Sequence, residues 1–266
     1  MIWLISRLRR DFSAWDRPTQ MGFTLALCLL VIAVPLFFIA PQDQRQTILI
    51  GIGALIIVTQ ILILWGNRGM VAPLTLAQRA FLRGDLEDTL ALLEPMHASG
   101  QADARTLTLL GNAYRQLGRL DESAAVLSEA IDNLPNHHYP LYGFGRTLIV
   151  QGNYADGAAY VERALETGAP PVVRFDIAEA YYRQGNIDDL VAILSDVDVD
   201  DEEPRELFVS FWRWRYAGGS PPRRELIEAG LPFWEGQAER FAVTPYGASV
   251  RNDVSVLKSL LKPMGE

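Results

Sequence analysis

The chain has 266 residues, which is enough for one or two domains. Its 24 basic and 32 acidic side chains give a formal net charge of −8 at pH 7. This balance argues against a nucleic-acid partner, because phosphate binding needs clustered Lys and Arg. The single cysteine, Cys28, excludes an internal disulfide. The apolar fraction of 49% is ordinary, but the longest apolar stretches gather near the N-terminus.

Residues 1–20 predict an amphipathic segment at a membrane surface. Apolar side chains recur there at helical spacing, at Ile5, Leu8, Phe12 and Trp15, with arginines between them. A helix with this pattern buries its apolar face in the membrane interface and keeps its charges in water. We expect this segment to lie on the cytoplasmic side.

The segment 21–68 predicts two transmembrane helices, at about 21–40 and 47–65. Neither stretch holds a charged side chain, and a helix of about 20 apolar residues crosses the roughly 30 Å of bilayer hydrocarbon. The residues between them, 41–46, predict a turn-like link and hence a tight antiparallel hairpin. A cleaved signal peptide is the alternative for the first stretch, but the apolar run is too long and no small-residue cleavage pattern follows it.

Arginine placement predicts the orientation of this hairpin. Four arginines precede the first span and three follow the second, against Arg45 alone in the link. Because cytoplasmic flanks carry the excess of Lys and Arg, we expect a two-span protein of a bacterial inner membrane with the N-terminus and the remaining chain in the cytoplasm. Residues 1–68 carry six arginines and three acids, net +3, so the remainder carries −11 to give the total of −8.

Small and polar residues in the second span indicate a contact with a further membrane helix. Gly51, Gly53 and Ala54 form a small-residue patch that permits close approach, and Gln60 can form a hydrogen bond with a neighbour. These four residues support an alternative function, in which the hairpin itself packs into a larger membrane complex.

Four glycines predict the architecture of the rest of the chain. Gly84, Gly118, Gly152 and Gly185 are spaced 34, 34 and 33 residues apart, and such a period indicates a stacked helical repeat. Each glycine follows a helical apolar pattern and permits the left-handed conformation that ends a helix. The position seven residues before each glycine is always small: Ala77, Gly111, Gly145 and Ala178.

We therefore expect a helix, a turn and an antiparallel helix, repeated four times within residues 70–205. The predicted repeats cover 70–103, 104–137, 138–170 and 171–205. Residues 206–266 remain helical in pattern and predict a cap over the open end of the stack, because a terminal repeat needs a neighbour to bury its apolar face. The predicted fold class is all-α, with a transmembrane helical hairpin, an α-solenoid and a helical C-terminal cap.

The repeats resemble the tetratricopeptide repeat family. The match is best within 104–137, and the resemblance covers roughly 71–197. The residues at that family's signature positions are Leu110, Gly111, Tyr114, Gly118, Leu127, Ala130 and Pro135. The resemblance implies a solenoid whose inner helices bind a protein partner in a groove.

By register, eight residues are predicted to face this groove. They are mixed polar and aromatic, which suits hydrogen bonding to an extended protein segment: Thr108, Asn112, Arg115, Tyr142, Arg146, Phe175, Glu179 and Tyr182. Asn112 matches one position of the family's clamp for C-terminal carboxylates. Residues such as Arg105, Thr108 and Tyr139 replace the lysines of that clamp, so the clamp itself is not expected.

No group of residues in the sequence predicts catalysis. The three histidines have no cysteine or carboxylate at metal-ligand spacing, and no nucleophile with a base or phosphate-binding loop is present. The acidic run 196–203 does not fit a calcium loop, because Asp201 stands where glycine is required. We expect no enzyme, no cofactor and no metal site.

The leading hypothesis is a membrane-anchored tetratricopeptide scaffold that binds a protein partner at the cytoplasmic face of the membrane. The alternative is a structural or accessory subunit of a larger membrane complex. A third reading resembles the anchored tetratricopeptide factors of cytochrome c maturation, which work outside the cytoplasm, and the arginine distribution argues against it.

Overall fold

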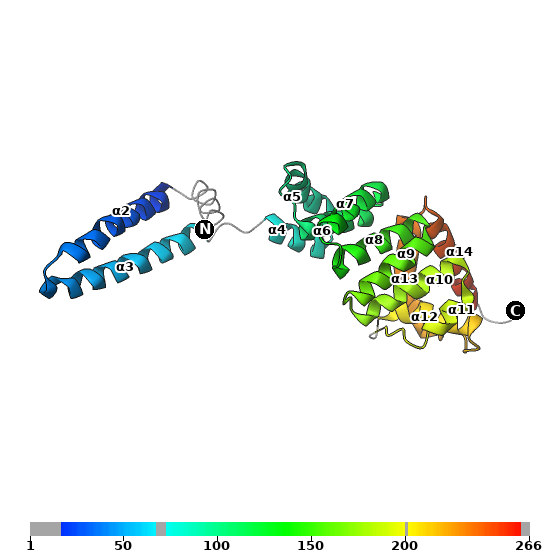
Figure 1. Cartoon of the computed structure of the whole chain (residues 1–266). Helices are drawn as coiled ribbons and strands as arrows, with labels where there is room; N and C mark the ends of the chain where they lie inside the picture. Colours follow the sequence, from blue (N-terminus) through cyan, green and yellow to red (C-terminus); the bar gives the residue numbers. More distant parts are fainter. Residues whose placement is uncertain (1–16, 68–72, 200–201, 262–266) are drawn as a thin grey trace. The chain divides into compact units, whose positions relative to one another are not determined.

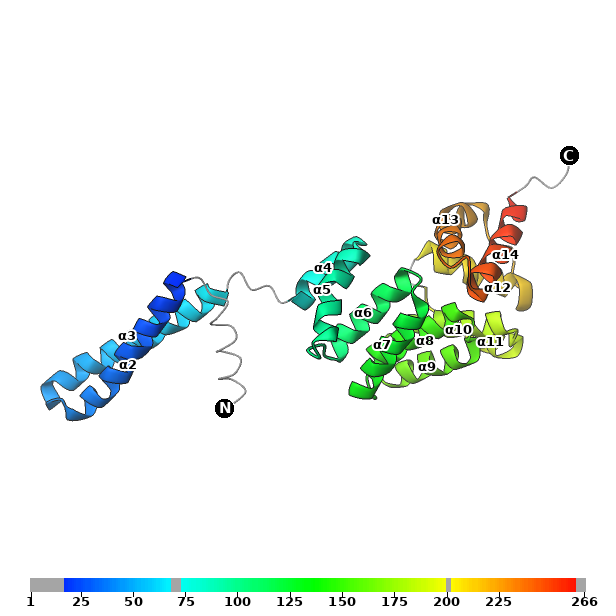
Figure 2. The ribbon, with the colours of Figure 1, turned by 90° about the horizontal axis from the view of Figure 1, so that it is seen from above.

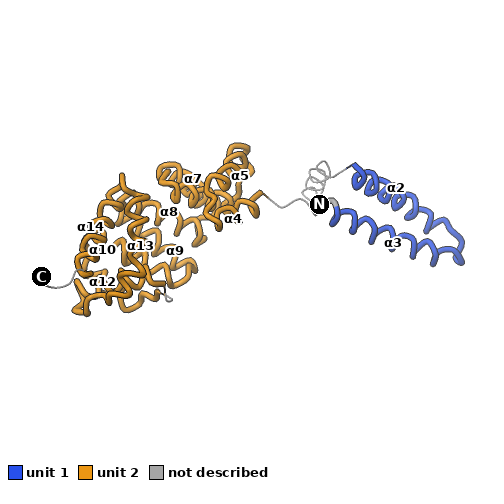
Figure 3. Tube along the Cα trace, turned by 180° about the vertical axis from the view of Figure 1, so that it is seen from behind, with its two compact units in different colours: residues 1–72 blue, residues 73–266 orange. Residues whose placement is uncertain are grey.

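The computed structural model describes residues 17–67, 73–199 and 202–261, and these residues form thirteen α-helices, one 3-10 helix and no strand. The prediction of an all-α fold is confirmed for this part of the chain. Two compact units are present, Met1–Ala72 and Pro73–Glu266 (Figure 3). Residues 1–16 of the predicted amphipathic N-terminal segment lie outside the described residues.

The N-terminal unit contains a helical hairpin of α2 (Arg17–Ile39) and α3 (Gln42–Asn67) (Figure 1). Both helices are long and apolar enough to cross a membrane, with hydropathies of 2.7 and 2.6. This finding rests on length and composition alone. Gly22 of α2 faces Leu62 of α3, whose side chain lies 3.5 Å from the position that a Cβ would take.

The prediction of a turn over 41–46 is wrong, because α3 already begins at Gln42. Only Ala40 and Pro41 separate the two helices. Asp43 lies in the first turn of α3, where a negative charge is favoured by the helix dipole. Arg45 Nε donates to the carbonyl of Ala40 at 3.1 Å and so satisfies a carbonyl near the end of α2. The polar residues of the link therefore form the start of a helix.

Four antiparallel hairpins follow in the second unit, one in each predicted repeat range. Their helices are α4 (Pro73–Arg83), α5 (Leu86–Ala98), α6 (Ala104–Gln116), α7 (Leu120–Asn133), α8 (His138–Gln151), α9 (Tyr154–Glu166), α10 (Arg174–Gln184) and α11 (Ile187–Ile193). The four periodic glycines all have positive φ, between +75° and +94°. The fourth hairpin is the least regular: the 3-10 helix Pro171–Val173 precedes it, and α11 has only seven residues.

Small residues allow the two helices of a hairpin to approach closely. A Cβ on Gly145 of α8 would lie 2.9 Å from the carbonyl oxygen of Gly157 on α9, and a Cβ on Gly157 would lie 3.0 Å from the carbonyl oxygen of Gly145. In the first and fourth hairpins, Ala77 and Ala178 hold the equivalent position and are fully buried. The recurring small residue therefore marks the helix crossing.

Three further helices complete the second unit: α12 (Glu203–Tyr216), α13 (Arg224–Arg240) and α14 (Pro245–Leu260). We predicted that they would cover the open end of the stack. They pack on its inner side, against α8 and α10, as Figure 2 shows. Trp212 of α12 is fully buried, and its ring centroid lies 5.3 Å from that of Phe175 on α10. The aromatic residues of α12 thus find their apolar partners on the inner face.

Replacing Gly145 by Ala tests the close helix crossing. The added methyl group would meet the backbone of α9, which cannot move aside as a flexible side chain can. We expect Gly145→Ala to lower the free energy of unfolding by about 1 to 3 kcal/mol. Gly236→Ala in α13 is the matched control, since nothing lies within 4 Å of its Cβ position. Thermal unfolding of the purified protein measures both, and equal melting temperatures for the two variants would contradict the crossing.

Candidate functional site on the inner face of the repeats

The eight predicted groove residues come from three successive inner helices. Helix α6 carries Thr108, Asn112 and Arg115, α8 carries Tyr142 and Arg146, and α10 carries Phe175, Glu179 and Tyr182. The structure divides this set into two parts. One part lines an uncovered groove at α6, and the other part is covered by the C-terminal helices.

The uncovered groove has a volume of about 510 Å³. Its lining residues are Gln78, Ala104, Arg105, Thr108, Leu109, Asn112, Leu134, His137, Tyr139 and Pro140. The side chain of Tyr139 is well exposed at 62%, whereas Thr108 is buried and donates its hydroxyl to the carbonyl of Ala104 at 2.6 Å. Asn112 Oδ1 accepts from Arg115 at 3.1 Å, so the amide nitrogen of Asn112 is the group left to donate to a ligand. The groove thus combines polar groups with an exposed aromatic ring.

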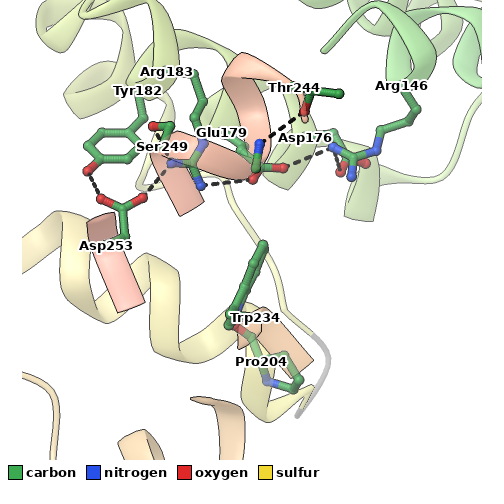
Figure 4. Close-up of polar contacts among 11 residues, drawn as sticks. Arg146, Asp176, Glu179, Tyr182, Arg183, Pro204, Trp234, Thr244, Ser249 and Asp253 are labelled. Carbon is green, nitrogen blue, oxygen red and sulfur yellow. Dashed lines mark hydrogen bonds and ion pairs between the residues drawn. The ribbon is translucent and has the colours of Figure 1, made fainter. Parts of the chain in front are cut away.

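The covered part is organised by a buried network of charged side chains (Figure 4). Arg146 of α8 pairs with Asp176 at 3.0 Å and with Glu179 at 2.9 Å. Arg183 of α10 pairs with Glu179 at 3.3 Å and with Asp253 of α14. The network therefore connects α8, α10 and α14 without a break.

Two tyrosines add hydrogen bonds to this network. Tyr182 donates its hydroxyl to Asp253 at 2.5 Å, and Tyr142 donates its hydroxyl to Asp176 at 2.8 Å. The carboxylates of Asp176, Glu179 and Asp253 are at most 5% exposed. Removing one member of a buried ion pair costs about 3 to 5 kcal/mol, because the partner charge stays buried and unpaired.

The ionisation of the network depends on a competition between burial and pairing. Burial alone would raise the pKa of Glu179, but the neighbouring Arg146 and Arg183 outweigh it and hold that pKa below the ordinary value of 4.5. For Asp253, burial dominates and the pKa is raised in spite of Arg183. The negative charge of Glu179, which lies between two arginines, therefore stabilises the fold.

This arrangement corrects the expectation that all eight residues line an open groove. Phe175 and Glu179 are 2% and 0% exposed, and Tyr182 and Arg146 bond to residues of the same chain. The physical reason is that α12 and α14 bring aromatic rings and Asp253 to the inner face of α10. Sequence reasoning missed Asp253, and its signal was an acid within the apolar stripe of Val250, Val254 and Leu257.

The predicted contact residues of the second apolar helix do not hold the hairpin together. A Cβ on Gly51 or Gly53 would meet nothing within 4 Å. Ala54 and Gln60 are exposed within the N-terminal unit. The small-residue patch is therefore available to a further helix and is not used between α2 and α3.

The described residues hold no group of three or more His, Cys, Asp or Glu side chains arranged to bind a metal ion. Two of the histidines have local roles: His97 Nε2 lies 2.8 Å from Glu129 Oε2, and His137 accepts a hydrogen bond from the backbone of Tyr139 at 3.3 Å. The absence of catalysis and of a cofactor stays a prediction.

These features define a class of protein, a stack of antiparallel helical hairpins with a partly covered inner face. A family model described as "Tetratricopeptide repeat" matches residues 74–138 and 142–190. The match supports the resemblance predicted from the glycine period in the repeat region.

Individual relatives share only part of this chain or diverge strongly from it. The chain is 30% identical over 82 residues to human (Homo sapiens) "Tetratricopeptide repeat protein 21B". These 82 residues are 31% of this chain and 6% of that protein. The chain thus spans a small fraction of the length of this curated relative. Among solved structures, "MamA MSR-1 C2" matches with a TM-score of 0.46 and 16% identity over 68% of this chain and 93% of that chain. "MamA 41-end from Desulfovibrio magneticus RS-1" matches with a TM-score of 0.47 and 18% identity over 72% and 98%. At this level of similarity, neither structure informs the function of this chain.

Replacing Glu179 by Gln tests the charge network through the pH dependence of stability. A carboxylate whose pKa is lower in the folded state stabilises the fold above its unfolded pKa and loses that contribution as pH falls. The wild type should therefore lose stability on acidification below about pH 4.5 more steeply than Glu179→Gln. Urea unfolding midpoints between about pH 7 and pH 3 measure the difference.

The exposed Glu166 at the end of α9 provides the control, since Glu166→Gln removes the same charge without breaking the network. At pH 7 we expect Glu179→Gln to be less stable than wild type by about 3 kcal/mol or more. A constant gap between wild type and Glu179→Gln at all pH values would contradict the role of the Glu179 charge.

Proposed function

We propose that this protein is a membrane-anchored scaffold that binds a protein segment in the uncovered groove at α4, α6 and α8. The observation that carries the proposal is the division of the inner face. The chain's own helices cover the α10 side, whereas Asn112 and Tyr139 remain accessible on the α6 side. Tetratricopeptide resemblance supports protein binding as the mode of action.

The two apolar helices support anchoring in a bilayer, and the arginine distribution supports a cytoplasmic groove at a bacterial inner membrane. Anchoring would serve the function by keeping the groove near the membrane, where it raises the effective concentration of a bound partner. The lipid bilayer and one protein partner are then the two binding partners of the chain. No catalytic step is part of the proposal.

A second candidate function is an accessory subunit whose hairpin packs into a membrane complex. The outward-facing patch of Gly51, Gly53 and Ala54, with the exposed Gln60, favours it. Native electrophoresis in mild detergent separates the two functions. A large assembly that is lost in the double variant Gly51→Leu with Gly53→Leu favours the accessory subunit. Loss of the assembly when groove residues are substituted favours the scaffold.

The groove is tested by the double substitution Asn112→Ala with Tyr139→Ala. It removes one hydrogen-bonding amide and one exposed ring from the lining without touching the buried network. We expect the partner recovered with wild-type protein from detergent-solubilised native membranes to bind about tenfold or more weakly. Quantitative mass spectrometry of the co-purified proteins gives the measurement.

A matched control changes an exposed asparagine and an exposed apolar residue that do not line the groove, Asn133→Ala with Val243→Ala. This control should recover the partner as wild type does. Equal recovery by the groove variant and the control would refute the groove assignment.

Reporter fusions after Glu266 test the proposed orientation. Alkaline phosphatase is active only outside the cytoplasm, and green fluorescent protein exported in unfolded form is dark. With the C-terminus in the cytoplasm, we expect a fluorescent fusion and an inactive phosphatase fusion in a bacterial host. The reverse pair of signals would move the groove, and the class of partner, to the other side of the membrane.

A further inference from the structure

A second cavity, of about 340 Å³, lies between the inner face and the C-terminal helices. Helices α6, α8, α10, α12 and α13 all contribute to it. Its apolar wall contains Phe175, Trp234 and Phe241, which are at most 3% exposed. Phe233 is half exposed at 49% and Arg240 is exposed, so the cavity opens to solvent beside α13.

The charged residues that line the cavity are unbalanced. They are four arginines and two acids: Arg115, Arg146, Arg205, Arg240, Asp176 and Glu202. Arg146 already pairs with Asp176 and Glu179, and Arg205 pairs with Glu202 at 3.2 Å. Both acids that line the cavity are therefore already paired with arginines that line it.

Arg115 and Arg240 are left without a carboxylate partner among the described residues. Arg115 donates from Nη2 to Asn112, while its Nε is buried and has no hydrogen-bond partner there. Arg240 donates to Gln116, a neutral amide. Burial and the neighbouring Arg146 lower the pKa of Arg115 to about 10, so this guanidinium lies in a place that disfavours its own charge.

The surrounding ion pairs do not remove this excess. When Arg183, Glu179 and Asp253, which continue the ion pairs of Arg146, are added to the charged residues of the lining, the set contains five arginines and four carboxylates and keeps one positive charge. Residues 1–68 carry a net charge of +3 and the later residues carry −11, for a total of −8. The unit Pro73–Glu266 is therefore otherwise strongly acidic. A cationic cavity in such a unit points to an anionic ligand.

We propose that this cavity binds a small organic carboxylate, with the carboxylate at Arg115 and Arg240 and the apolar body against Phe175, Trp234 and Phe241. One negative charge matches the single excess positive charge, which disfavours a phosphate dianion. Guanidinium groups bind carboxylates with charge-assisted hydrogen bonds, and an aromatic wall suits a planar or apolar body. This site is distinct from the protein-binding groove, and the two adjoin where Arg115 of the cavity donates to Asn112 of the groove.

Fluorine NMR of para-fluorophenylacetate tests the site with full-length protein in lipid nanodiscs at pH 7. The neutral para-fluorophenylacetamide has nearly the same shape, and nanodiscs without protein report partition into lipid. We expect broadening of the carboxylate signal by the protein and little broadening of the amide signal. Equal broadening of both compounds would overturn the proposal, and so would no broadening of either.

Two variants locate the binding. Arg115→Gln and Arg240→Gln should each weaken binding about tenfold or more, because each removes a charge-assisted contact. Arg240 is exposed, so its variant remains informative if Arg115→Gln fails to fold. Arg224→Gln is the matched control, since Arg224 pairs with Glu228 outside the cavity and should leave binding unchanged. Wild-type affinity in the Arg240 variant, or displacement by inorganic phosphate but not by unlabelled phenylacetate, would overturn the assignment.

Discussion

The buried ion network around Glu179 is the constraint on which the second unit depends. Arg146 and Arg183 approach Glu179 from two helices, and Asp253 extends the contact to α14. Because these charges are removed from water, each must keep its partner, and the helices that carry them are fixed in relative position. Helix α12 then packs its Trp212 ring against Phe175 of α10, one of the helices that the network holds. Trp234 completes the arrangement by donating its indole N–H to the carbonyl of Pro204 at 2.6 Å.

The repeat architecture could be predicted from the sequence because its cause is local. A glycine with positive φ ends each inner helix, and a small residue seven positions earlier lies at the helix crossing. Both features repeat with the same period, so each hairpin can be recognised within about 34 residues. The start of α3 was missed for a related reason: the polar link has turn-like composition, but Asp43 and Arg45 serve there as helix-terminal residues.

The position of the C-terminal helices could not be predicted, because it depends on contacts between distant residues. Tyr182 and Asp253 are 71 residues apart, and Arg183 and Asp253 are 70 apart. The register of the repeats correctly identifies Glu179 and Tyr182 as inner-face residues, but register cannot tell an open inner face from one covered by the same chain. The apolar stripe of α14 indicated a buried helix, and only the acid within that stripe indicated a charged partner.

The covered half of the inner face restricts where a partner can bind. To reach Glu179, a protein partner would have to displace α14 and break the pair between Arg183 and Asp253. Breaking one such buried pair costs about 3 to 5 kcal/mol, which corresponds to a loss of more than about two powers of ten in affinity. A segment bound at Asn112 and Tyr139 meets no such cost, because those side chains already face solvent or a groove. The same network that holds the C-terminal helices therefore directs binding to the α6 side of the solenoid.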